Sequence, residues 1–498
     1  MPDLAPVLLT AAIVAWLVSP LCASLARRLG VVDAPDLRKR HRAATPYFGG
    51  VAVFSALVAA LVVAVPLSDS GLAGGDASMV GGPMLALLGG AGVIFAIGLV
   101  DDVVPVRARY KMLAQGGVAV WMWSAGVRLD SVPLVESVFG LGCTYLSLPL
   151  TVLWIVGITN AVNLIDGLDG LAAGIGAIAA AAISWIAFHT QQQACGLVLA
   201  ALAAALAGFL IHNRHPAKLF LGDAGSLLIG FLLATCAVET ASNTAQVSAL
   251  GVPLLALAVP ILDLSFTVVR RIMERRGIFS PDRNHVHYRL QGIGCSHHQA
   301  VAILWAESGT LTVLALLPVW LSASATQQAM TFVIVALLHL AFFRLAGAVR
   351  MRESLRALRA GVRRAQEARR RRREYDSLDL QFRQAHTLEA WCRALEDSAE
   401  RLDLVSLQIE LPRRTGDVVT RTWQGGERVS QSLKTTLTVP DRRADQSLRL
   451  HVELASESFE AAAEGVAMLG KLVDRYPASQ LGKDEWRAPR AAGVADPA

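Results

Sequence analysis

The chain has 498 residues, more than one compact core usually contains, so at least two structural units are expected. Hydrophobic residues make up 54% of the chain and charged residues 17%, with a mean hydropathy of +0.46. Because soluble domains carry about a quarter charged residues, this balance indicates a membrane protein and excludes a disordered or fibrous chain. The six cysteines are scattered without a CxxC pair, so neither a disulfide framework nor a zinc site of that type is predicted.

Apolar segments long enough to approach the ~20 residues of a membrane span recur along the first 346 residues. There are about eleven of them: 5–26, 48–67, 83–100, 112–127, 147–163, 171–190, 195–212, 223–240, 249–269, 300–320 and 328–346. The first segment has no basic n-region and no small-residue cleavage site, so we expect a retained span rather than a signal peptide.

The segments between these spans alternate in charge. Lys and Arg gather in 27–42, 107–111, 214–218 and 270–289, whereas 68–82, 191–194, 241–248 and 321–327 contain none and 128–146 contains only Arg128. Cytoplasmic loops carry the excess of Lys and Arg, which predicts an N-terminus outside and a C-terminus in the cytoplasm. We therefore expect a multi-pass membrane protein, with residues 1–348 as its transmembrane domain.

From about residue 350 onward, the amino-acid composition is typical of a soluble domain. Twelve Arg and three Glu leave a charge of +9 between residues 344 and 374, and this predicts an Arg-rich helical linker over 349–377. Beside a hydrophobic helix, such a stretch indicates the cytoplasmic membrane surface rather than a nucleic-acid partner. Alternating apolar residues and two amphipathic segments then predict a small α+β accessory domain over 378–477, without a catalytic motif, and a disordered tail over 478–498.

Carboxylates lie at or just beyond the cytoplasmic ends of the predicted spans: Asp101, Asp102, Asp166, Asp169, Asp223, Asp263 and Asp282. Each one by itself is explained equally well by helix capping or by pairing with a nearby Arg. Because ionisable groups are costly in lipid, the whole set on one face, together with Lys111, His285 and His287, indicates a functional site.

Five cytoplasmic segments carry this pattern: DAPDLRKRH, GLVDDVVPVRARYK, NAVNLIDGLDGLAAG, FLGDAGS and RR…ERRGIFSPDRNHVHYRL. In the third, Asn160, Asn163, Asp166 and Asp169 recur every three residues, which places them near one face of a helix end. Oxygen ligands without a Cys/His cage suit Mg²⁺. Carboxylates for a metal, with Lys, Arg and His for phosphate oxygens, are the groups that phosphoryl transfer uses.

Together these segments resemble the polyprenyl-phosphate N-acetylhexosamine-1-phosphate transferases of glycosyltransferase family 4, the WecA- and TagO-like enzymes related to MraY. The resemblance covers roughly residues 5–346, and NAVNLIDGLDG, FLGD and the DD pair carry it. It implies a Mg²⁺-dependent (or Mn²⁺-dependent) enzyme that transfers GlcNAc 1-phosphate from a UDP-N-acetylhexosamine to undecaprenyl or another polyprenyl phosphate. UMP is released on the cytoplasmic face, and a cell-envelope polysaccharide such as an O-antigen is started. No nucleic acid is implied, a homodimer is compatible, and a protein partner for the C-terminal domain is unidentified.

The resemblance also implies residue roles. Asp223, with Asn163, would bind the metal; Asp101 and Asp102 would activate the lipid phosphate, and Lys111 would bind phosphate as the third catalytic residue. The nucleotide-sugar would contact a further set: Asn160, Asp166, Asp169, Arg283, His285 and His287. The family often has His-x-His-His where this chain has Tyr288 in the fourth position, which leaves the pyrophosphate contact or the sugar preference open. The peptide-binding His-rich signature of the MraY branch is absent, which argues against a UDP-MurNAc-pentapeptide donor.

Two other classes are weighed against this one. A polytopic transporter also uses intramembrane carboxylates, but places them near the bilayer midplane on broken helices. An intramembrane aspartyl protease would need two Asp deep in the membrane and would have no use for Lys111 or the two His. Magnesium-dependent release of UMP from a UDP-sugar would distinguish all three.

Overall fold

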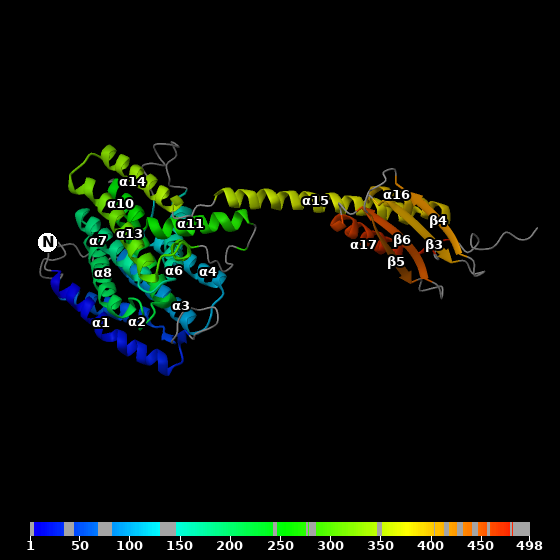
Figure 1. Cartoon of the computed structure of the whole chain (residues 1–498). Helices are drawn as coiled ribbons and strands as arrows, with labels where there is room; N and C mark the ends of the chain where they lie inside the picture. The colour runs from blue at the N-terminus through cyan, green and yellow to red at the C-terminus, as the bar shows by residue number, and fades with distance from the viewer. Residues whose placement is uncertain are drawn as a thin grey trace, which may run out of the picture. The chain divides into compact units, whose positions relative to one another are not determined.

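Figure 1 shows the computed structural model of the chain. It describes residues 4–33, 44–67, 82–129, 146–242, 247–274, 277, 285–345, 351–402, 404–412, 418–425, 432–440, 447–455, 459–478 and 481. The chain divides into two compact units, Met1–Leu358 and Arg359–Ala498, and each is described by itself.

The first unit is helical apart from one short strand pair. Its helices are α1 (Ala5–Arg28), α2 (Gly49–Leu67), α3 (Gly82–Val103), α4 (Ala108–Ser124), α6 (Ser147–Ile165), α7 (Leu171–His189), α8 (Gln193–Asn213), α9 (Gly222–Ser242), α10 (Val247–Ala256), α11 (Ala258–Met273), α12 (Val286–Gly292), α13 (His297–Trp320) and α14 (Ala325–Leu345). The antiparallel strands β1 (Val32–Asp33) and β2 (Thr45–Pro46) connect α1 with α2.

The first unit is a polytopic α-helical membrane domain, as the sequence predicts. Within the described part of the chain, eight helices are long and apolar enough to cross a membrane, and the bent pair α10 and α11 would make a ninth. Each of the about eleven predicted spans coincides with a helix or with this pair, and eight or nine of them meet this measure of length and hydropathy. Helix α2 has 19 residues and no charged side chain, whereas α4 has 17 residues and carries Arg109 and Lys111.

The ninth span is broken because of a proline. Helices α10 and α11 meet at an angle of 70°. Pro260 has no N–H to donate to the carbonyl of Ala256, four residues earlier, so the helix cannot continue through this point. The hydroxyl of Ser308 in α13 donates to that carbonyl at 3.3 Å and satisfies it.

Helix α9 lies at the centre of the first unit, where it packs against α2, α3, α6 and α7. It is the most buried of the candidate spans. Small residues permit this packing, as they do at membrane helix interfaces in general. A Cβ on Gly98 of α3 would lie only 2.6 Å from Ala224 Cα, and Gly50 of α2 lies against the backbone of Gly225. The start of α9 is therefore held between the end of α3 and the start of α2.

The second unit is a small α+β domain entered through a long helix. Helix α15 (Met351–Gln384) runs across the unit boundary, and α16 (Leu388–Arg401) and α17 (Phe459–Arg475) flank four strands in the sequence. The strands β3 (Ser406–Pro412), β4 (Val418–Gln424), β5 (Ser432–Pro440) and β6 (Ser447–Ala455) form an antiparallel sheet in the order β4-β3-β6-β5. The predicted alternating runs fall on these strands.

Alternation along the strands builds the core of this unit. Leu407, Ile409 and Leu450 are buried on one face of the sheet together with Trp391 of α16 and Leu469 of α17. The expected linker, 349–377, ends seven residues before α15 does, at Gln384. Of the expected disordered tail, only Ala478 and Leu481 lie among the described residues.

Candidate active site

A half-buried lysine joins two carboxylates from different helices. Lys111 Nζ, in the first turn of α4, donates to Asp101 Oδ2 at 2.6 Å and to Asp223 Oδ2 at 2.7 Å. Asp101 lies in the last turn of α3 and Asp223 is the second residue of α9. The structure thus brings together three residues that the sequence assigns to one site. We call Asp101, Lys111, Asn163 and Asp223 the Lys111 centre.

Asn163, in the last turn of α6, completes this centre. Its Nδ2 donates to Asp223 Oδ1 at 3.0 Å and to Ser226 Oγ at 2.9 Å. The amide oxygen is then the group that Asn163 would offer to a cation. Ser226 was not a candidate from the sequence, although it lies three residues after Asp223 and therefore on the same face of α9.

Asp102 holds the start of α9 in place. Its Oδ1 accepts the backbone N–H of Asp223 at 2.7 Å and its Oδ2 accepts that of Ala224 at 3.1 Å. The first N–H groups of a helix have no partner within it, so Asp102 acts as a cap supplied by α3. Gly222 has φ +74°, and a Cβ there would lie 2.6 Å from Asp102 Oδ2. Glycine is therefore required for Asp102 to approach, and Asp102 positions Asp223.

Asn160 lies one turn earlier on α6 and has different partners. Its Nδ2 donates to Gln115 Oε1 and to the carbonyl of Val156 at 2.7 Å. This contact joins α6 to α4 rather than to the carboxylates. Gln115 is a further residue that was not predicted, although it lies four residues after Lys111 and so on the same face of α4.

Negative charge is concentrated around the segment that follows α6. Burial, together with repulsion from neighbouring carboxylates, raises the pKa of Asp166 to about 8. The neighbours that act on Asp166 are Asp223, Asp102 and Asp169. Burial is the larger of these causes, because it disfavours the charged carboxylate, and the neighbouring carboxylates add to it.

The two predicted histidines lie beside this segment. His285 Nδ1 is hydrogen-bonded to Asp263 Oδ2 at 2.7 Å, and Asp263 Oδ1 accepts the N–H of Val286 at 2.8 Å. His287 is buried against Gly167, and neither of its ring nitrogens has a hydrogen-bond partner. Burial lowers the pKa of His287 to about 4, so its ring is neutral at physiological pH. Asp263, to which the sequence gave no specific role, orients His285.

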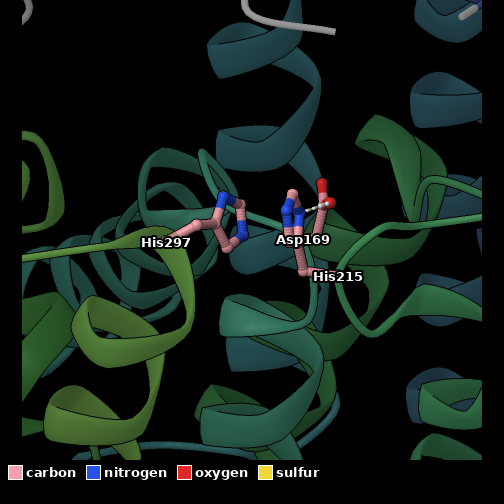
Figure 2. Close-up of side chains that lie close together, drawn as sticks. All are labelled: Asp169, His215 and His297. Atoms are coloured by element: carbon pink, nitrogen blue, oxygen red, sulfur yellow. Dashed lines mark hydrogen bonds and ion pairs between the residues drawn. The ribbon is translucent and has the colours of Figure 1, made fainter. Parts of the chain in front are cut away.

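Asp169 belongs to a second cluster, with His215 and His297 (Figure 2). Asp169 Oδ2 is hydrogen-bonded to His215 Nδ1 at 2.6 Å and accepts the N–H of Ala217 at 3.1 Å. Neither histidine was a candidate from the sequence, because each lies in a different segment of the chain from Asp169 and no spacing rule connects them. Arg283 and Asp282 lie outside the described residues.

The charges and donors of the Lys111 centre define its chemistry. Two carboxylates, Asp101 and Asp223, share the one ammonium group of Lys111, and Asp102 lies next to them in the chain and in space. Carboxylate and amide oxygens are the ligands that Mg²⁺ prefers, and Mg²⁺ usually completes its shell with water and phosphate. The residues present therefore fit a hard divalent cation next to a phosphate group.

Comparison with known proteins identifies the family of this chain. The family model described as glycosyl transferase family 4 matches residues 84–241. A Bacillus subtilis protein named a "probable undecaprenyl-phosphate N-acetylglucosaminyl 1-phosphate transferase" is 34% identical over 312 residues, which are 61% of this chain and 83% of that protein. A decaprenyl-phosphate N-acetylglucosaminephosphotransferase of Mycobacterium tuberculosis is 37% identical over 62% of this chain and 80% of its own.

A third relative is more distant. The undecaprenyl-phosphate alpha-N-acetylglucosaminyl 1-phosphate transferase of Salmonella typhi is 28% identical over 65% of this chain and 84% of its own. The fold, the centre and these relatives define a multi-pass membrane transferase. The chain belongs to glycosyl transferase family 4, among the polyprenyl-phosphate N-acetylhexosamine-1-phosphate transferases.

Proposed function

We propose that this chain transfers N-acetylglucosamine 1-phosphate from UDP-GlcNAc to a polyprenyl phosphate and releases UMP. The observation that carries the proposal is Lys111, bound between Asp101 and Asp223 where three helices converge. The names of the relatives support the sugar phosphate and the polyprenyl phosphate acceptor.

The reaction is a phosphoryl-type displacement. An oxygen of the lipid phosphate attacks the β-phosphorus of UDP-GlcNAc, and the bond from that phosphorus to the bridging oxygen breaks. Its electron pair leaves with UMP, and the product is a polyprenyl diphosphate that carries GlcNAc. In such reactions catalysis consists mostly of positioning and charge stabilisation.

The chain's own residues supply both of these. Lys111 would contact a phosphate oxygen, which requires that it exchange one of its two carboxylate partners for the substrate. Asp101, released from part of that pairing, would accept a hydrogen bond or proton at the lipid phosphate. Asp102 holds Asp223 in position by capping the start of α9. His287, neutral and unpartnered beside Gly167, is available to donate to the donor's phosphate or sugar.

Mg²⁺, with Mn²⁺ as the alternative ion, fits the oxygen donors of the centre. Asp223 and Asn163 would hold it. When bound, it would neutralise charge on the pyrophosphate as the leaving group departs.

The proposed reaction takes place at the cytoplasmic face of a bacterial inner membrane, where a soluble nucleotide meets a lipid headgroup. The excess of Lys and Arg in the segments that contain the site supports this side. The lipid-linked product would begin a cell-envelope polysaccharide. A transporter is the alternative class, but the carboxylates lie at helix ends, in hydrogen bonds to Lys111 and to the start of α9.

A donor panel tests the proposal. Purified protein in detergent, with polyprenyl phosphate and Mg²⁺, would be given UDP-GlcNAc, UDP-GalNAc, UDP-glucose and UDP-MurNAc-pentapeptide in separate reactions. We expect a lipid-linked sugar diphosphate and equimolar UMP from UDP-GlcNAc. Turnover of another nucleotide sugar in its place would contradict the assigned donor, and the absence of any product with all four would contradict the reaction.

A further inference from the structure

The second cluster joins three separate segments of the cytoplasmic end. Asp169 lies between α6 and α7, His215 follows α8, and His297 is the first residue of α13. The rings of His215 and His297 are stacked, with centroids 3.9 Å apart, beside the Asp169 carboxylate (Figure 2). The cluster shares no residue with the Lys111 centre, and the proposed transfer reaction assigns no step to either histidine.

These three side chains carry the donor atoms of a transition-metal site. One ligand atom from each lies within 4.8 Å of the others. Two imidazoles and one carboxylate hold Zn²⁺ and related ions in sites that keep a further position open. Mg²⁺ prefers an all-oxygen shell, so this cluster differs chemically from the Lys111 centre.

Two observations show that the cluster has atoms free to bind a metal ion. His297 Nε2 is buried and has no hydrogen-bond partner. Both hydrogen bonds given above for Asp169 use Oδ2, so Oδ1 is the oxygen available to an ion. The surrounding backbone is fixed by Asn213, whose Oδ1 accepts the N–H of Gly170 at 3.0 Å and whose Nδ2 donates to Leu219 O at 2.9 Å.

We propose that Asp169, His215 and His297 bind one transition-metal dication of the Zn²⁺ type. Bound there, the ion would join the segment after α6, the segment after α8 and the start of α13. Zn–N bonds are about 2.0–2.1 Å, so two ligand atoms of one ion lie no more than about 4.2 Å apart. Stacked rings direct their nitrogen lone pairs in nearly parallel planes, so one imidazole has to turn out of the stack for both to bind the same ion. The bound ion would replace the hydrogen bond between His215 and Asp169.

Metal binding by the full-length protein tests this. Tag-free protein, treated with a chelator and dialysed, would be titrated with Zn²⁺ in competition with a chromophoric chelator. Bound zinc would then be counted by mass spectrometry of the metal. We expect one equivalent for wild type and affinities weaker by about tenfold or more for His215→Gln and Asp169→Asn, the scale on which a disturbed metal site loses affinity. His189→Gln is the matched control, since His189 stacks on Trp185 of α7 away from this cluster.

A second measurement needs no variant. Co²⁺ added to the metal-free wild type should give the visible absorption of a four- or five-coordinate ion, and an excess of Zn²⁺ should abolish it. Well under one equivalent of bound zinc would overturn the proposal, as would unchanged affinity in both variants or a Co²⁺ spectrum like that of the hydrated ion. None of these readouts depends on transferase activity, so failure here leaves the proposed reaction standing.

Discussion

Lys111 is the residue on which the charge balance of the centre depends. It supplies the ammonium that bridges Asp101 and Asp223. Lys111→Met should lower kcat/KM at least about tenfold, a loss of ~1.4 kcal/mol or more in transition-state stabilisation, because two carboxylates would face each other and a phosphate ligand would be lost. The check is steady-state kinetics, with Lys434→Met in the exposed part of β5 as control. Kinetics like those of wild type would remove Lys111 from the mechanism.

Asp101 and Asp102 are neighbours with different partners, and substitution should separate their roles. Asp101→Asn and Asp102→Asn should each lower turnover, with UDP-sugar binding retained in at least one. Asp102→Asn should also lower the melting temperature more than Asp101→Asn does, because an N-cap is worth ~1 kcal/mol and a negative charge there also favours the helix dipole. Kinetics and thermal shift are the measurements. If both variants turn over like wild type, the pair is only a capping feature.

The sequence alone identifies the site residues that lie in a recognisable motif. The motifs NAVNLIDGLDG, DD and FLGD identified Asn163, Asp101, Asp102 and Asp223. The structure joins Asn163 and Asp102 to Asp223 by direct hydrogen bonds, and Asp101 to Asp223 through Lys111. His215 and His297 were missed because their contact with Asp169 depends on how α8 and α13 end and begin in space. Gln115 and Ser226 were missed although helical spacing from Lys111 and Asp223 points to them.

The helices position the centre through their ends and their close approach. Gly98 lets α3 touch the start of α9, where a Cβ would lie 2.6 Å from Ala224 Cα. Gly98→Ala should therefore displace α9 relative to α3, with a cost of about 1–3 kcal/mol in stability, as for overpacking in general. Activity should fall with it, since Asp101 and Asp223 would move apart.

The control for this substitution lies on the same helix. A Cβ on Gly92 meets nothing within 4 Å, so Gly92→Ala should leave the melting temperature and the turnover unchanged or slightly raise stability. Equal effects of the two substitutions would show that the α3–α9 contact does not position the centre.

Hydropathy located the helices of the first unit. Every predicted apolar segment is helical, since the backbone must satisfy its own hydrogen bonds in lipid. The bend between α10 and α11 follows from Pro260, which cannot donate to the carbonyl of Ala256. A mean hydropathy over the segment does not reveal such a missing backbone hydrogen bond. The basic residues Arg109 and Lys111 belong to α4 itself, and a 17-residue helix with two cations falls short of a span by composition.

For the whole molecule, the division into two units predicts separable functions. All residues of the Lys111 centre lie in the first unit, and the second has its own buried core. A chain truncated after Arg350 should keep its activity in detergent, although it would lose anionic-lipid contacts of the Arg-rich segment, about 1 kcal/mol per Arg near the surface. A truncated protein that inserts normally but is inactive in detergent would place an obligatory contact in the second unit.

The central claim is that the Lys111 centre transfers a sugar phosphate to a lipid phosphate. Its most direct test is UMP release from UDP-GlcNAc by the purified full-length protein, with and without polyprenyl phosphate, and with EDTA in place of Mg²⁺. We expect release only when lipid and Mg²⁺ are both present. Asp223→Asn should lower the rate of UMP release more than about tenfold, or ~1.4 kcal/mol in the barrier, while the exposed control Asp397→Asn should release UMP like wild type. Release without the lipid, or an active Asp223→Asn protein, would contradict this claim.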